Sequence, residues 1–65
     1  MELEMKMRLY KIERDRLIEH VTGMLRDNYK YVFSEACTEN VRLYFSLQSK
    51  IHVIFLALQA RPNHA

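Results

Sequence analysis

The chain has 65 residues, of which 10 are lysine or arginine and 8 are aspartate or glutamate, so its formal net charge at pH 7 is +2. A chain of this length forms one small domain, and such domains usually need disulfides, a metal ion or a partner subunit to supplement a small core. The single cysteine, Cys37, excludes an internal disulfide, and the small net charge does not by itself indicate a nucleic-acid partner.

Apolar residues in the first part of the chain recur at alternating steps of four and three. This heptad spacing keeps one stripe of an α-helix facing a partner helix, and we call that stripe the seam. No proline or glycine interrupts the segment before Gly23, so the pattern predicts a helix over about residues 3–26. The seam of this helix consists of Leu3, Met7, Tyr10, Arg14, Leu17, Val21, Met24 and Asn28.

Residues 27–33 break the heptad pattern. Asp27 and Asn28 favour a turn, because their side chains can form hydrogen bonds with nearby backbone groups. Ser34 is the best candidate to cap the N-terminus of a second helix, and Glu35 there opposes the positive end of the helix dipole. We therefore expect a turn over about residues 27–33.

The heptad pattern resumes after this turn and continues almost to the end of the chain. It predicts a second helix over about residues 34–60, which Pro62 stops because proline cannot continue a helix. The seam of this helix consists of Phe33, Cys37, Asn40, Tyr44, Leu47, Ile51, Ile54 and Leu58.

One antiparallel register pairs the two seams. In that register the numbers of facing residues sum to 61, so Leu17 faces Tyr44 and Val21 faces Asn40. We therefore predict an all-α fold, an antiparallel two-helix hairpin with coiled-coil packing, as a single domain over residues 1–65.

A β-structure is the alternative for the second half of the chain. Val41, Leu43 and Phe45 alternate with polar residues, and β-rich residues follow after residues 48–50, so the alternative is an N-terminal helix followed by a C-terminal β-hairpin. Residues 48–50 contain no glycine or asparagine for a tight hairpin turn. The apolar residues from Ile54 onward do not alternate with polar ones, and this favours the helix.

Two polar residues occupy positions inside the seams, Arg14 and Asn40, in addition to Asn28 at the end of the first seam. A buried polar residue in one core layer can fix the register and the oligomeric state at some cost in stability. The alternative is that both residues lie at the edge of the bundle, with the Arg14 head group in water.

A second set of apolar residues lies off the seams, where a simple hairpin has no interior position for it. Exposed apolar patches of this kind usually mark an interface, and two-fold dimers are the commonest oligomers. We expect a homodimer that forms a four-helix bundle, with a heterologous helical partner as the alternative occupant. The predicted contact residues are Met5, Leu9, Ile12, Phe45, His52 and Leu56. These features predict a non-enzymatic interaction or oligomerisation module, a small regulatory or scaffold protein.

Aromatic and basic residues support an alternative function, a small dimeric regulator that binds RNA or DNA. Exposed aromatic rings beside cations can stack on unpaired bases. Acidic residues interleave with the basic ones along the first helix, so the basic face is not continuous. The residues for this alternative are Arg8, Lys11, Arg26, Tyr29, Lys30 and Tyr31.

No pattern in the sequence indicates an enzyme. There is no glycine-rich phosphate loop, nucleophile motif or metal-ligand spacing, so we expect no catalytic residues, no cofactor and no bound metal. The most apolar stretch, residues 41–60, is interrupted by Arg42, Lys50 and His52, and we expect no membrane span. The chain starts with alternating charges instead of a signal peptide, and we expect a cytoplasmic protein.

Overall fold

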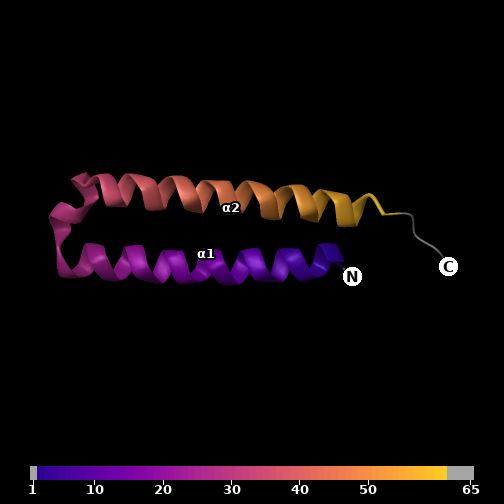
Figure 1. Ribbon diagram of the computed structural model, residues 1–65, viewed down its shortest axis with the longest axis horizontal. Helices are drawn as coiled ribbons and strands as arrows, with labels where there is room; N and C mark the ends of the chain where they lie inside the picture. The colour runs from indigo at the N-terminus through magenta and orange to yellow at the C-terminus, as the bar shows by residue number, and fades with distance from the viewer. Residues whose placement is uncertain (1, 62–65) are drawn as a thin grey trace.

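The computed structural model describes residues 2–61, and within that range the chain is helical with no strand. Helix α1 spans Glu2–Asp27, a short 3-10 helix, η1, spans Tyr29–Phe33, and helix α2 spans Glu35–Gln59. The two long helices lie side by side and antiparallel, with η1 at the bend that joins them (Figure 1). The predicted all-α helical hairpin is confirmed.

The alternative β-hairpin is wrong, because residues 41–58 all lie within α2. Leu47, Ile51 and Ile54 follow each other at steps of four and three, and all three side chains are buried. Helical spacing gathers these residues on one side of the chain, whereas strand spacing would divide them between two faces. Burial of one stripe therefore outweighs the preference of the β-branched residues for strands.

The helices end close to the predicted positions. Helix α1 begins one residue before residue 3 and ends one residue after residue 26. The Ser34 side chain accepts a hydrogen bond of 3.1 Å from the backbone N–H of Cys37, so the predicted N-cap is confirmed. Ala60 is the C-cap of α2, and its N–H donates to the Leu56 carbonyl at 2.9 Å. Pro62, the predicted stop, lies outside the described residues.

The bend is more ordered than the predicted turn, because most of it forms the 3-10 helix η1. The Asn28 side chain caps this helix by accepting a hydrogen bond of 3.1 Å from the Lys30 N–H. The Ser34 hydroxyl donates to the Tyr31 carbonyl at 2.6 Å, so Ser34 binds the end of η1 and the start of α2 together. Turn residues predict that the chain changes direction, but they do not specify this conformation.

Helix α2 provides most of the core. Its buried residues are Cys37, Leu47, Ile51 and Ile54, and all four occupy predicted seam positions. Helix α1 has no buried residue, although its seam from Leu3 to Val21 is less exposed than the rest of its surface. Each helix thus turns its predicted stripe toward the other, and one hairpin alone covers these stripes only in part.

Contacts between the helices agree with the predicted register. The Arg14 guanidinium donates to the Gln48 side-chain oxygen at 3.0 Å, and the Lys50 ammonium lies 5.5 Å from the centre of the Tyr10 ring. The numbers in these pairs sum to 62 and 60, next to the expected 61.

The seam fails only at the bend. Phe33 was predicted to lie in the seam, but 86% of its surface is exposed. The reason is that Phe33 ends the 3-10 helix, whose tighter winding takes it out of phase with α2. Tyr31, only 6% exposed, is the buried aromatic of the bend instead. Met24 and Asn28, the last seam positions of α1, are also exposed.

We predict that replacing a seam leucine destabilises the hairpin far more than replacing a leucine beside it. Leu47 is 4% exposed and Leu43 is 51% exposed, so Leu47→Ala leaves a cavity in the seam and Leu43→Ala does not. We expect Leu47→Ala to lower the free energy of unfolding by about 2–5 kcal/mol, and Leu43→Ala by less than about 1 kcal/mol. Urea denaturation followed by circular dichroism at one protein concentration measures both. Equal losses would contradict the assignment of Leu47 to the core.

Candidate interaction surface

The two helices leave an apolar groove on one face of the hairpin, in the half nearer the bend. Its volume is about 340 Å³. It is open to solvent, and among residues 2–61 no charged residue lines it. The lining residues are Leu17, Ile18, Val21 and Thr22 of α1 with Asn40, Val41, Tyr44 and Phe45 of α2. We call the side of the hairpin that carries this groove the groove face.

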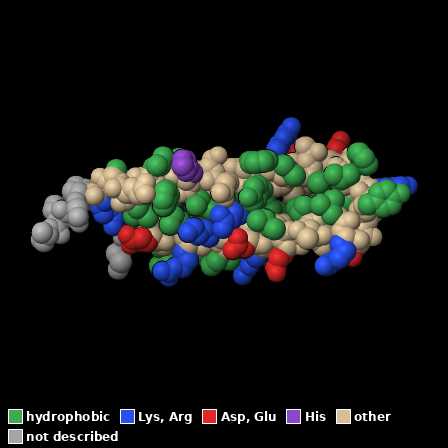
Figure 2. All heavy atoms as spheres, turned by 180° about the vertical axis from the view of Figure 1, so that it is seen from behind, with side chains coloured by type: hydrophobic (Ala, Val, Ile, Leu, Met, Phe, Trp, Pro, Cys, Tyr) green, Lys and Arg blue, Asp and Glu red, His purple; other side chains and the backbone are tan. Residues whose placement is uncertain are grey.

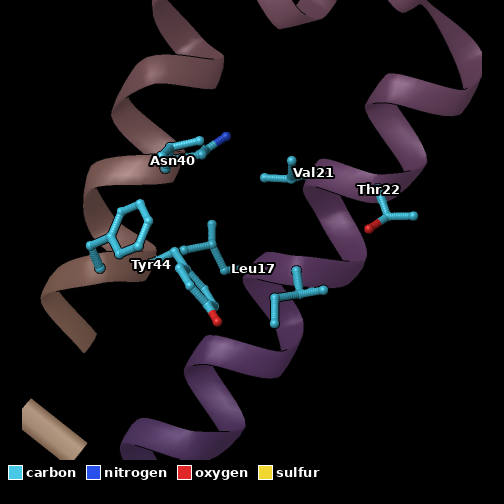
Figure 3. A pocket seen from close by; sticks show the side chains of 8 residues that line it. Leu17, Val21, Thr22, Asn40 and Tyr44 are labelled. Atoms are coloured by element: carbon cyan, nitrogen blue, oxygen red, sulfur yellow. The ribbon is translucent and has the colours of Figure 1, made fainter. Parts of the chain in front are cut away.

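The groove arises where the seam is filled incompletely. Val21 and Asn40 point toward one another across the gap between the helices (Figure 3). The Asn40 amide donates a hydrogen bond of 2.6 Å to the Tyr31 hydroxyl, so its polar end is bound to the bend and does not pack on Val21 as an apolar side chain would. Ile18 and Val41 each lie next to a seam residue, about 100° around the helix, and they form the walls of the groove.

The walls of the groove are apolar and exposed. Ile18 is 42% exposed, Val41 is 41% exposed and Phe45 is 62% exposed. Hydrophobic side chains lie between the two helices and gather toward the bend in the view of this side in Figure 2. An uncharged patch of this kind is typical of a surface that another molecule covers.

The opposite face of the hairpin differs in charge. One of its grooves is lined by Glu13, Arg16 and His20 together with Leu43. Another is lined by Lys6 and Lys50, among other residues. Apolar side chains on that side thus lie beside charged ones, which favours contact with water there.

The six predicted contact residues are all exposed, but they do not form one patch. Met5 lies two residues from both Leu3 and Met7, so it is on the outer edge of α1, opposite the seam. Leu56 lies in the same way on the outer edge of α2, between Ile54 and Leu58. Of the six residues, which are Met5, Leu9, Ile12, Phe45, His52 and Leu56, only Phe45 lines the groove.

The predicted contact residues did not include Ile18 and Thr22, which line the groove with Phe45. They also did not include Val41, although Val41 is one of the apolar residues that lie off the seam. A signal for Ile18 exists in the sequence. Residues seven apart lie on the same side of a heptad helix. On α1, the row that contains Ile18 also contains Glu4, Lys11 and Leu25. This row changes from charged to apolar toward the bend. The change indicates that the end of α1 nearer the bend is the one with apolar side chains left exposed to water.

The six residues proposed for nucleic-acid binding are also divided. Tyr31 is wrong as a base-stacking residue, because it is 6% exposed and its hydroxyl accepts the hydrogen bond from Asn40. Tyr29 is 74% exposed and lies near Lys30 and Arg26 at the bend. The other two, Arg8 and Lys11, lie toward the opposite end of α1, some 20 Å or more away at the rise of an α-helix.

The polar seam residue Arg14 has partners at the surface. Its guanidinium donates to Gln48 at 3.0 Å and forms an ion pair of 3.2 Å with Asp15. The Arg14 side chain is 22% exposed. Arg14 thus lies at the edge of the seam, about one helical turn from Leu17 and Ile18 on the side away from the bend.

Helix α2 is long and apolar enough, by length and composition alone, to cross a membrane, contrary to what its interrupting charges led us to expect. The core helix of a soluble protein meets the same two criteria, but such a helix is mostly buried. Only 11% of the most apolar 18-residue stretch of α2 is buried inside the hairpin. Apart from its buried seam residues, most of the apolar surface of α2 therefore lacks cover in a single chain.

No protein-family model, curated protein or solved structure matches this chain. Within residues 2–61, no three histidine, cysteine, aspartate or glutamate side chains lie close enough to hold a metal ion.

We predict that the Tyr31 hydroxyl stabilises the bend. Tyr31→Phe removes the acceptor of the Asn40 amide and leaves the ring in place. We expect it to lower the free energy of unfolding by about 0.5–1.5 kcal/mol. Tyr29→Phe is the matched control, since its exposed ring should give no measurable change. Thermal or urea unfolding measures both, and equal stability of the two variants would contradict a structural role for the Tyr31 hydroxyl.

Proposed function

We propose that this chain is a non-enzymatic self-association module, in which a second copy covers the groove face and completes a four-helix bundle. The observation that carries the proposal is an apolar groove without charged lining residues, in a hairpin whose α1 buries no side chain. Such a module acts by holding chains together, as a small regulatory or scaffold subunit.

The dimensions of the hairpin support this proposal. Helices of 25 and 26 residues are about 38 Å long, and two of them side by side form a face about 20 Å wide. A face of that size is comparable to the roughly 800 Å² that each partner contributes to a standard protein interface. A second copy brings a face of the same size and the same apolar groove.

A lipid bilayer is a less favourable cover. Lys50 lies inside α2, and placing a lysine at the centre of a bilayer costs about 2.5–3.5 kcal/mol on insertion scales. Insertion of α2 alone would also separate Lys50 from the Tyr10 ring and the seam of α2 from α1. Self-association covers the apolar surface without these losses.

We predict that two matched pairs of substitutions separate the groove face from the opposite face. Val41→Glu with Phe45→Glu places two carboxylates in the groove, and Leu43→Glu with Val53→Glu places two on the opposite face. Phe45 and Val53 are 62% and 64% exposed, and Val41 and Leu43 are 41% and 51% exposed, so the variants remove comparable surface. Light scattering after size exclusion should give twice the chain mass of 7.9 kDa for wild type and the opposite-face variant, and a single mass for the groove variant, with helicity retained.

Two results would contradict the proposal. One is a wild-type mass of 7.9 kDa at micromolar concentration, and the other is an equal mass for both double variants. A parallel flotation assay with vesicles of phosphatidylcholine and phosphatidylglycerol identifies the lipid alternative. A wild-type chain that is monomeric and floats with these vesicles would replace self-association with membrane binding. A monomer that stays in the buffer would leave a heterologous partner as the cover.

A further inference from the structure

The two ends of the groove face differ, because the row of residues beside the seam of α1 changes in character along the helix. On α1, the row next to the seam reads Glu4, Lys11, Ile18 and Leu25 from the open end to the bend. On α2, the corresponding row reads Val41, Gln48 and Phe55 from the bend to the open end, with no charged residue. The α1 row therefore changes from charged to apolar, whereas the α2 row is uncharged throughout.

Two hairpins related by a two-fold axis can bring these faces together in two ways over their full length. With both bends at the same end, α1 of each copy lies on α2 of the other. With the bends at opposite ends, α1 lies on α1 and α2 lies on α2. Adjacent helices are antiparallel in both arrangements, so helix dipoles do not distinguish them.

The opposite-end arrangement places unlike residues together. Full overlap puts its axis near the middle of α1, so facing residues there have numbers that sum to about 29. Ile18 then faces the partner's Lys11, and Leu25 faces the partner's Glu4. Arg14 faces the partner's Asp15, which is a favourable contact, but burying a charge against an apolar side chain is unfavourable.

The same-end arrangement has fewer such contacts. Of the charged residues in the α1 row, Glu4 faces an apolar residue of the partner, Phe55, and Lys11 does not. The register of the hairpin, with its sum of 61, then also applies between copies, so Ile18 faces the partner's α2 near Val41 and Phe45. Lys11 lies level with the partner's Lys50, but the Lys50 side chain lines a groove of the opposite face. The nearest residue of the partner's groove-face row is therefore Gln48. Each Arg14 lies across from the partner's Gln48, the residue type that already accepts its hydrogen bond within the chain at 3.0 Å.

We infer that a second copy of this chain covers the groove face with both bends at the same end, so that α1 of each copy lies on α2 of the other. This inference rests on the proposed self-association, and it adds the orientation. Sliding the opposite-end arrangement until the two apolar halves meet is the remaining alternative. That shift leaves the open halves of both hairpins without cover and reduces the shared face to about half its length.

Distances between spin labels in the full-length dimer test this orientation. Cys37 is replaced by alanine, and labels are attached through Lys30→Cys at the bend in one sample and Gln59→Cys at the open end in another. Light scattering on each labelled sample must first give twice the chain mass. We expect a distance below about 25 Å in both samples, because the helices of a bundle lie about 8–10 Å from their neighbours.

If the bends of the two copies lay at opposite ends, the two Lys30→Cys labels would be about 40 Å apart, the length of a 25-residue helix. A dimer with that separation would overturn the inferred orientation and leave the proposed self-association intact. A single chain mass before labelling, with Cys37 in place, would contradict the proposed self-association itself. A mixed sample of Lys30→Cys and Gln59→Cys chains is the control, and its cross-distance should be long where the two like distances are short.

Discussion

The packing of the two heptad seams against each other is the interaction on which the rest of the structure depends. The buried residues of α2 all lie in its seam, and the least exposed residues of α1 lie in the seam that faces them. This one row of contacts fixes the antiparallel direction and the register. It also sets the rotation of each helix about its own axis, and so it decides which apolar residues stay exposed.

The bend maintains that register. Two short interactions connect it to α2, namely the Ser34 cap and the Asn40 hydrogen bond to the Tyr31 hydroxyl. Within the bend, the Asn28 side chain caps η1. The Asn40 hydrogen bond also lies beside the groove, where Val21 faces a polar residue across the seam instead of an apolar one. Asn40 thus contributes both to the stability of the bend and to the incomplete filling of the seam beside it.

Much of the fold follows from the sequence, because seam spacing and helix caps are local or periodic signals. Ser34 was identified from residue type and position alone, and the stripe from Cys37 to Ile54 from its spacing. The 3-10 helix was not predicted, since no turn residue distinguishes it from other bends. Phe33 was consequently placed in the seam, whereas the bend exposes it and buries Tyr31.

The candidate surface was harder to predict than the fold. Apolar residues off the seam were recognised, but residues such as Met5 and Leu56 lie on opposite edges of the hairpin, and only the assembled structure separates the edges from the faces. The groove also depends on the direction of the Asn40 side chain, which spacing does not encode. The absence of charge in the groove is in turn what the proposed assembly explains, since charges occur on the opposite face at the same levels.

The most direct test of the central claim is the contact between Leu17 and Tyr44 across the seam. A nuclear Overhauser effect between the Leu17 methyl groups and the Tyr44 ring measures it, in a sample where a few labelled chains are diluted into unlabelled ones so that only contacts within a chain are seen. The account predicts a strong effect for this pair. An effect from Leu17 to Ile51, one heptad further along α2, would show a shifted register and contradict the account.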